Sequence, residues 1–244
     1  KRPFTSISLY EIDLNTLAVD TIATDTGFIS QAYYSPDGEK LLIIGSAAAF
    51  DNLGKNCGSH PIPNDFDNQA YIMDLATKEV KAISLDFDPN IDGFIHWAKG
   101  DGKIYFRGED GFYSRIFVYD PKTEKYDRLP IEVDYVSTFS MSKEKPSQIA
   151  YIGEGYDHAG VAYLYDVKKR SNKLLADPFK KTLDKINLAK DESWTFTASD
   201  GTVIDGVICY PPDFDPAKKY PLIVYYYGGT NPSERSIRHP YTPQ

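Results

Sequence analysis

The run Ile116-Phe117-Val118-Tyr119-Asp120 is a β-branched and aromatic segment that ends in an aspartate and leads into polar residues. The same pattern occurs four times in the 244 residues, at 8–13, 70–74, 116–120 and 162–166. The terminal aspartates of the four copies are separated by 61, 46 and 46 residues. A period in the forties, stretched once by an insertion, is typical of the four-stranded blade of a β-propeller.

A second repeated element lies between these segments and has the pattern of a strand, a tight turn and another strand. In two of its copies, Asp37-Gly38 and Asp101-Gly102 supply turn residues that tolerate positive φ. Together the two elements predict a pair of strands at roughly residues 7–22 and three four-stranded units, at roughly 28–87, 91–132 and 135–177.

We therefore expect a mainly β chain, with a partial β-propeller of about three and a half four-stranded blades over residues 1–178. Propellers close a ring of blades, so an open arc exposes two sheet edges and predicts further blades upstream. A complete β-sandwich or a small self-contained barrel is the alternative, which the repeat period disfavours.

The insertion that lengthens the first interval lies at about residues 47–68 and is rich in Gly, Pro, Asn and Asp. This composition predicts an irregular loop. Long loops on a rigid scaffold often carry binding functions, so His60 and Asp65 are candidate substrate contacts. The alternative is a disordered excursion without a role in binding.

The periodic pattern ends after Asp177-Pro178, where we place a domain boundary. Residues 179–188 form a polar, short helical connector, and residues 192–209 predict two paired strands around the turn Asp200-Gly201. Leu222 to Tyr227 is an apolar run between Pro221 and Gly228-Gly229, which predicts a strand buried on both faces of a sheet. An ordinary hairpin turn at the two glycines is the alternative.

Composition narrows the classes of function. The formal net charge of -8 argues against nucleic acid as the main partner, because phosphate recognition needs clustered Lys and Arg. No apolar run reaches the length of a membrane span, and the N-terminal residues lack a signal-peptide pattern. Cys57 and Cys209 do not form a disulfide framework, and we expect Cys209 to be a buried thiol. Localisation stays open, with a periplasmic or secreted location slightly favoured over a cytoplasmic one.

The C-terminal segment carries a specific resemblance. A Ser-Asp-Gly-Thr turn at 199–202, Tyr-Pro-Pro at 210–212, and the run Lys-Tyr-Pro-Leu-Ile-Val at 219–224 precede Tyr227-Gly228-Gly229. With the blade repeats before it, this arrangement resembles the prolyl oligopeptidase family of serine peptidases, and within it the dipeptidyl-peptidase branch. One departure is Thr230-Asn231-Pro232, since many relatives have proline directly after the second glycine.

The resemblance implies a propeller followed by an α/β-hydrolase domain, whose first strands lie in residues 179–244. It implies a peptide substrate that is cleaved by acyl transfer at a serine, with release of N-terminal dipeptides favoured and acylaminoacyl release and internal cleavage as the alternatives. It also assigns Tyr227 to the oxyanion hole, where a phenol hydroxyl would stabilise the tetrahedral intermediate by about 3 kcal/mol. The alternative is that Tyr227 is a packed aromatic residue without a catalytic role. A homodimer of the full-length protein is compatible with this family.

The sequence lacks the remaining chemistry of such an enzyme. No Gly-x-Ser-x-Gly pentapeptide occurs in the 244 residues, and three of the four histidines precede the hydrolase strands. We therefore expect the chain to be inactive alone. No metal-ligand motif or phosphate-binding loop occurs either, so we expect no metal and no cofactor. The alternatives are a non-catalytic propeller scaffold with a degenerate hydrolase domain and, more weakly, a glycosidase with paired carboxylates.

Overall fold

The computed structural model describes residues 7–55, 67–226 and 235–236. These residues form strands with two short helices, α1 (Ala49–Asn52) and α2 (Lys180–Leu183). The strands are β1 (Leu9–Ile12), β2 (Val19–Ala23), β3 (Ile29–Tyr34), β4 (Lys40–Ser46), β5 (Asn68–Asp74), β6 (Val80–Ala82), β7 (Asn90–Trp97), β8 (Ile104–Asp110), β9 (Tyr113–Asp120), β10 (Lys125–Arg128), β11 (Tyr135–Met141), β12 (Gln148–Glu154), β13 (Val161–Asp166), β14 (Ser171–Ala176), β15 (Asp191–Thr197) and β16 (Val203–Cys209).

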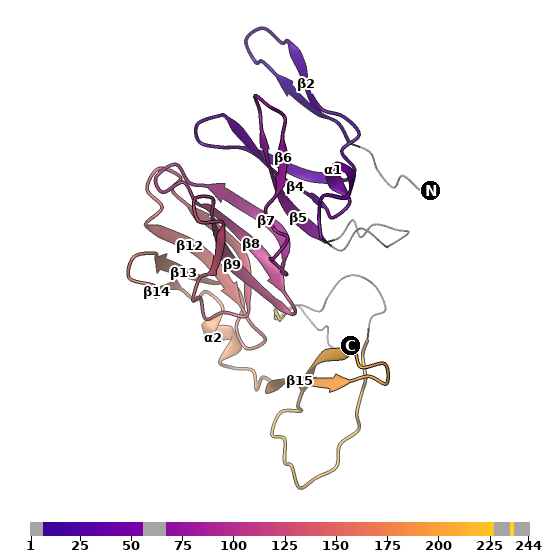
Figure 1. Ribbon diagram of the computed structural model, residues 1–244. Helices are drawn as coiled ribbons and strands as arrows, with labels where there is room; N and C mark the ends of the chain where they lie inside the picture. Colours follow the sequence, from indigo (N-terminus) through magenta and orange to yellow (C-terminus); the bar gives the residue numbers. More distant parts are fainter. Residues whose placement is uncertain (1–6, 56–66, 227–234, 237–244) are drawn as a thin grey trace.

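Twelve of the strands form three four-stranded antiparallel sheets, in the orders β3-β4-β5-β6, β7-β8-β9-β10 and β11-β12-β13-β14. Each sheet follows chain order, and the three lie one after another along the molecule (Figure 1). β1 and β2 form a hairpin before them. The predicted units are confirmed, and the fold is that of a mainly β propeller chain rather than a sandwich. The number of blades in the complete ring stays a prediction.

The repeated aspartates close equivalent turns. The carboxylates of Asp13, Asp74 and Asp166 each accept hydrogen bonds from the backbone N–H groups two and three residues later, at 2.8–3.1 Å. Four residues beyond each aspartate of the repeat, the chain takes a left-handed φ, at Leu17, Lys78, Glu124 and Arg170. An aspartate favours such turns because its short side chain replaces a backbone acceptor. The repeat in the sequence is therefore the repeat of one turn.

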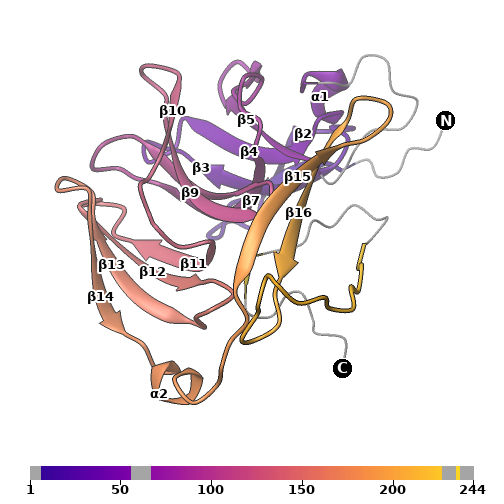
Figure 2. The same ribbon diagram turned by 90° about the horizontal axis from the view of Figure 1, so that it is seen from below.

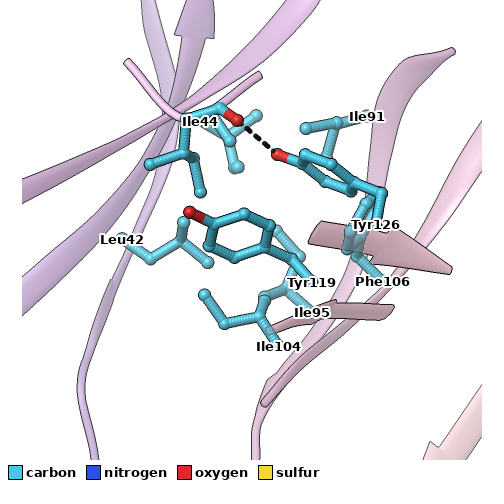
Figure 3. Close-up of a pocket in the computed structure, with 10 residues that line it drawn as sticks. Leu42, Ile44, Ile91, Ile95, Ile104, Phe106, Tyr119 and Tyr126 are labelled. Carbon is cyan, nitrogen blue, oxygen red and sulfur yellow. Dashed lines mark hydrogen bonds between the residues drawn. The ribbon is translucent and has the colours of Figure 1, made fainter. Parts of the chain in front are cut away.

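The core lies between the sheets, where the apolar faces of neighbouring sheets meet. Leu42 and Ile44 of the first sheet pack with Ile91, Ile104 and other side chains of the second. Each such side chain, once fully buried, stabilises the fold by roughly 1.5–3 kcal/mol. Figure 3 shows the small cavity at this contact, about 10 Å³ in volume, which is room for no more than one water molecule. It is therefore a packing defect and not a ligand site.

Polar contacts between neighbouring sheets recur with the period of the repeat. The Tyr126 hydroxyl donates to the Ile83 carbonyl at 2.9 Å across 43 residues (Figure 3). The ion pairs Lys81–Glu124, at 2.5 Å, and Arg170–Asp127, at 3.2 Å, also join residues 43 positions apart. Successive sheets thus meet through equivalent positions, as expected for repeats that pack against their neighbours.

The insertion leaves the first sheet between β4 and β5. It begins with α1, in which Phe50, Asp51 and Asn52 have φ values of 53°, 59° and 66° and so are not right-handed helix. The prediction of an irregular loop is confirmed for residues 47–55, and residues 56–66 lie outside the described part of the chain.

The third sheet is followed by α2 and then by the two-stranded sheet β15–β16, which turns at Asp200-Gly201 as predicted (Figure 2). The side chains of Trp194 and Phe196 stack at 5.2 Å, and both are exposed. The domain boundary near residue 178 stays a prediction. Among the described residues, neither helix has the length or apolar character needed to cross a membrane.

Two expectations for this segment are wrong. Residues 222–226 form no strand, and their five side chains are 70–84% exposed. Apolar sequence alone does not make a strand, because backbone N–H and C=O groups need a neighbouring strand, and none pairs with this run in the described chain. Cys209 is exposed rather than buried, since it is the last residue of β16 on an uncovered two-stranded sheet.

The Asp74 turn allows a test by titration. The pKa of the Asp74 carboxyl lies below its ordinary value of 3.8, chiefly because the Thr77 backbone N–H bonds to the charged form. The charged carboxylate therefore stabilises the fold fully at pH values above its pKa in the unfolded chain. This stabilisation is lost as the pH falls through the lower pKa of the folded state. We expect Asp74→Ala to melt at a lower temperature than wild type at pH 7. The difference between the two melting temperatures should become smaller near pH 2, where the carboxyl is protonated.

The control for this test is Asp74→Asn, which keeps the side-chain acceptor and should melt closer to wild type than Asp74→Ala does. The titration itself is followed by NMR of the carboxyl carbon. A folded-state pKa at or above 3.8 would contradict the account of the turn.

Candidate functional site

All three residues singled out by the sequence, Tyr227, His60 and Asp65, lie outside the described residues. Their positions as site residues therefore stay predictions. The structure does describe the chain that flanks them, namely residues 47–55 and 67–68 around the insertion and Tyr226 and Arg235 around the Tyr-Gly-Gly motif. These flanking residues define the candidate site.

The insertion emerges from a well-ordered base. The side-chain carbonyl of Gln69, which is 2% exposed, accepts a hydrogen bond from the Lys55 backbone at 2.9 Å. The Lys55 ammonium donates to the Phe87 carbonyl at 2.8 Å and pairs with Asp88 at 3.2 Å. The buried Tyr71 hydroxyl donates to the Ser46 carbonyl at 2.8 Å. Both ends of the insertion are thus fixed to the end of the first sheet at which β4 finishes and β5 begins.

Arg235 is the one charged residue of the C-terminal segment that the described part of the chain places in a buried site, with 8% of the residue exposed. Its Nε donates to Asp134 at 2.7 Å, and its terminal nitrogens donate to Asp191 and to the Ser193 hydroxyl. Its backbone N–H donates to the Phe112 carbonyl at 3.0 Å. Asp134 and Phe112 belong to propeller loops, whereas Asp191 and Ser193 belong to β15. Arg235 therefore joins three segments.

Aromatic rings complete this junction. The Arg235 guanidinium lies 5.5 Å from the ring centre of Tyr113 and 5.0 Å from that of Tyr156, distances at which the ring faces attract a cation. Burial raises the pKa of Tyr156 to about 12, so its hydroxyl stays neutral. Burial lowers the pKa of Arg235, but the hydrogen bonds to Asp134 and Asp191 outweigh it, and the net shift is upward. The guanidinium remains charged.

Sequence reasoning missed this junction, because a single arginine in a polar segment carries no pattern. His96 and His158, which it assigned to structural positions, each contact a neighbouring side chain. His96 packs against Phe139 at 5.1 Å, with its pKa lowered by burial, and His158 contacts Asp157 at 2.6 Å. Within the described ranges, no group of three or more His, Cys, Asp or Glu side chains could hold a metal ion.

Arg235 can be tested by substitution. Arg235→Gln would leave Asp134 and Asp191 without their cation in a half-buried site, and we expect it to reduce the free energy of unfolding by about 3 kcal/mol. The matched control is Arg170→Gln, which removes an exposed ion pair with Asp127 and should cost less than about 1 kcal/mol. Both are measured by urea unfolding, and equal effects of the two substitutions would contradict the assignment.

The chain has a curated relative among known proteins. Over 160 residues, or 65% of its length, it is 28% identical to dipeptidyl-peptidase 5 of Porphyromonas gingivalis. The match spans 23% of the length of that relative. No protein-family model matches the chain.

Solved structures share the fold. TolB from Acinetobacter baumannii matches 70% of this chain and 38% of its own, with a TM-score of 0.52 and 21% identity. An acylaminoacyl peptidase in complex with a chloromethyl ketone matches 88% of this chain and 48% of its own, with a TM-score of 0.51 and 14% identity. At these identities the likeness shows the fold alone. With the sequence relative, this likeness supports the resemblance of the chain to the propeller-containing peptidases of the prolyl oligopeptidase family.

Proposed function

We propose that this chain is part of a serine peptidase that cleaves peptides by acyl transfer and releases N-terminal dipeptides. The observation that carries the proposal is the relation to dipeptidyl-peptidase 5 in a chain that also contains the Tyr-Gly-Gly motif. In this proposal a serine hydroxyl outside these 244 residues attacks the peptide carbonyl, and the Tyr227 hydroxyl donates a hydrogen bond to the resulting oxyanion.

Further support comes from the extent of the structural matches. The propeller sheets run from Leu9 to Ala176, and their length is close to the 70% of the chain that the TolB match covers. The acylaminoacyl peptidase matches a larger share, which requires residues beyond Ala176. This difference favours a hydrolase-type segment after the propeller over a propeller alone.

The Arg235 junction gives the proposal a structural basis. It ties β15 and the chain beyond the Tyr-Gly-Gly motif to propeller loops at Phe112 and Asp134. In a propeller peptidase such contacts would hold the catalytic segment in a fixed position relative to the propeller, through which the peptide enters. His60 and Asp65, in the insertion, are the proposed substrate contacts of the propeller.

The test uses the polypeptide expressed from its complete reading frame and treated with a fluorophosphonate probe. We expect one serine outside residues 1–244 to be labelled, and we expect the isolated 244-residue chain to take no label and to cleave no peptide, since it contains no Gly-x-Ser-x-Gly. A folded polypeptide without a label would favour the non-catalytic scaffold instead.

The role of Tyr227 is tested in the same polypeptide. Tyr227→Phe removes one donor to the oxyanion, and the expected loss is roughly 100- to 1,000-fold in kcat with KM nearly unchanged. Tyr226→Phe, at the neighbouring tyrosine, is the matched control and should retain activity. Loss of activity in both variants, or in neither, would rule out the assigned role.

A further inference from the structure

The first strands of the three four-stranded sheets share one irregularity. β3, β7 and β11 each shift register with the second strand of their sheet near their start, between Ile29 and Gln31, between Ile91 and Gly93, and between Val136 and Thr138. Each shift leaves one residue unpaired as a β-bulge. The bulged residues, Ser30, Asp92 and Ser137, are equivalent positions of the repeat.

Two of the three sheets satisfy the bulge in the same way. The Ser30 hydroxyl donates to the Ile44 carbonyl at 3.2 Å, and the Ser137 hydroxyl donates to the Ile152 carbonyl at 3.4 Å. In each case the acceptor lies on the second strand of the same sheet. The serines therefore have a structural role, which is to hold the bulged strand against its neighbour.

The middle sheet departs from this pattern. Asp92 replaces the serine and pairs with Arg107 of β8. Arg107 occupies the position in the second strand that corresponds to Ile44 and Ile152, whose carbonyls accept the serine hydrogen bonds in the other two sheets. The Arg107 guanidinium also donates to the Ser137 carbonyl of β11 at 2.7 Å, so this pair joins two neighbouring sheets. A charged, inter-sheet arrangement is more costly to build than a serine, and the two serine-containing sheets close the same bulge without a charge.

The backbone of β7 is strained at the same place. A second register shift, between Gly93 and His96, accompanies φ values of 113° at Gly93 and 47° at Phe94. Among the described residues, Phe94 is the only non-glycine residue inside a strand with a left-handed φ. Strain of this kind is kept where it places a side chain for a purpose.

The strained backbone presents an aromatic ring. Phe94 is 41% exposed on a strand that lies toward the middle of the arc of sheets (Figure 2), although its neighbours Gly93 and Ile95 are buried. The Arg107 guanidinium lies 4.6 Å from the ring centre and supports it from one side. A β-carbon on Gly93 would lie 3.4 Å from the side-chain amide nitrogen of Gln31. A polar group of β3 therefore lies next to the residue that precedes Phe94.

We propose that Phe94 is a specificity-determining contact on the inner wall of the propeller and binds an apolar or aromatic side chain of the peptide. Arg107, which is paired with Asp92, supports the ring, and the Gln31 amide lies beside Gly93, the residue before Phe94. The inference rests on the proposed function, since it takes a peptide as the ligand. Apolar and aromatic side chains suit the site because the exposed surface is a ring whose cationic neighbour is already paired.

The test measures binding and not turnover. The complete polypeptide, treated with fluorophosphonate, is titrated into Ala-Phe-Ala-Phe-Lys and Ala-Ala-Ala-Ala-Lys, each labelled with fluorescein on the lysine side chain and followed by fluorescence anisotropy. Wild type should bind the first peptide more tightly. Phe94→Gly should weaken the first peptide about tenfold and change the second less than about twofold.

Two further variants separate binding from folding. Phe94→Gly relieves the left-handed strain, whereas Phe94→Ala does not. The Gly variant should therefore melt at a higher temperature than the Ala variant, and both variants should lose the preference for the aromatic peptide. Phe214→Ala removes an equally exposed ring elsewhere, at 41%, and should leave both affinities unchanged.

Equal affinity of wild type for the two peptides, or an equal loss of both in Phe94→Gly, would overturn the inference. Failure of the proposed function has a different signature, which is a folded polypeptide that takes no fluorophosphonate label. Because anisotropy needs no turnover, the two failures are distinguishable.

Discussion

A four-stranded sheet with two apolar faces can be buried only between two neighbours, and this constraint governs the whole structure. Leu42 and Ile44 face the second sheet, whereas Leu41 and Ile43 of the same strand face the opposite way, toward the β1–β2 hairpin. Alternation along one strand thus supplies both contacts of the sheet. The arc of sheets and the recurring inter-sheet contacts follow from the same requirement.

The repeat also makes departures from it informative. Where a sheet meets only structural demands, the same solution recurs, as with the aspartate turns and the bulged serines. Asp92, Arg107 and Phe94 break the pattern in one sheet, where they replace a neutral bulge with an ion pair and a partly exposed ring. Comparison of repeats within one chain therefore separates residues that build the fold from residues that are available for binding, without any comparison between proteins.

The sequence predicted the sheets well, because their signals are local. An aromatic strand, an aspartate and a short turn determine a hairpin within a few residues, so the limits of the three units were correct to within a few positions. Leu222 to Tyr226 was misassigned because a strand also needs a partner, and no local pattern reports one. Arg235 could not be found, since its partners are as far away in sequence as Asp134. His60, Asp65 and Tyr227 stay predictions.

The distance in sequence between Arg235 and Asp134 has a consequence for folding. Contacts within each sheet join neighbouring strands, and the polar contacts between sheets described above join residues 30 or 43 apart, whereas Arg235 and Asp134 are 101 residues apart. Closing a longer loop costs more chain entropy, and contacts between distant residues form slowly. The sheets should therefore assemble one after another along the chain, and the Arg235 junction should close last, once both of its carboxylate partners are already in place.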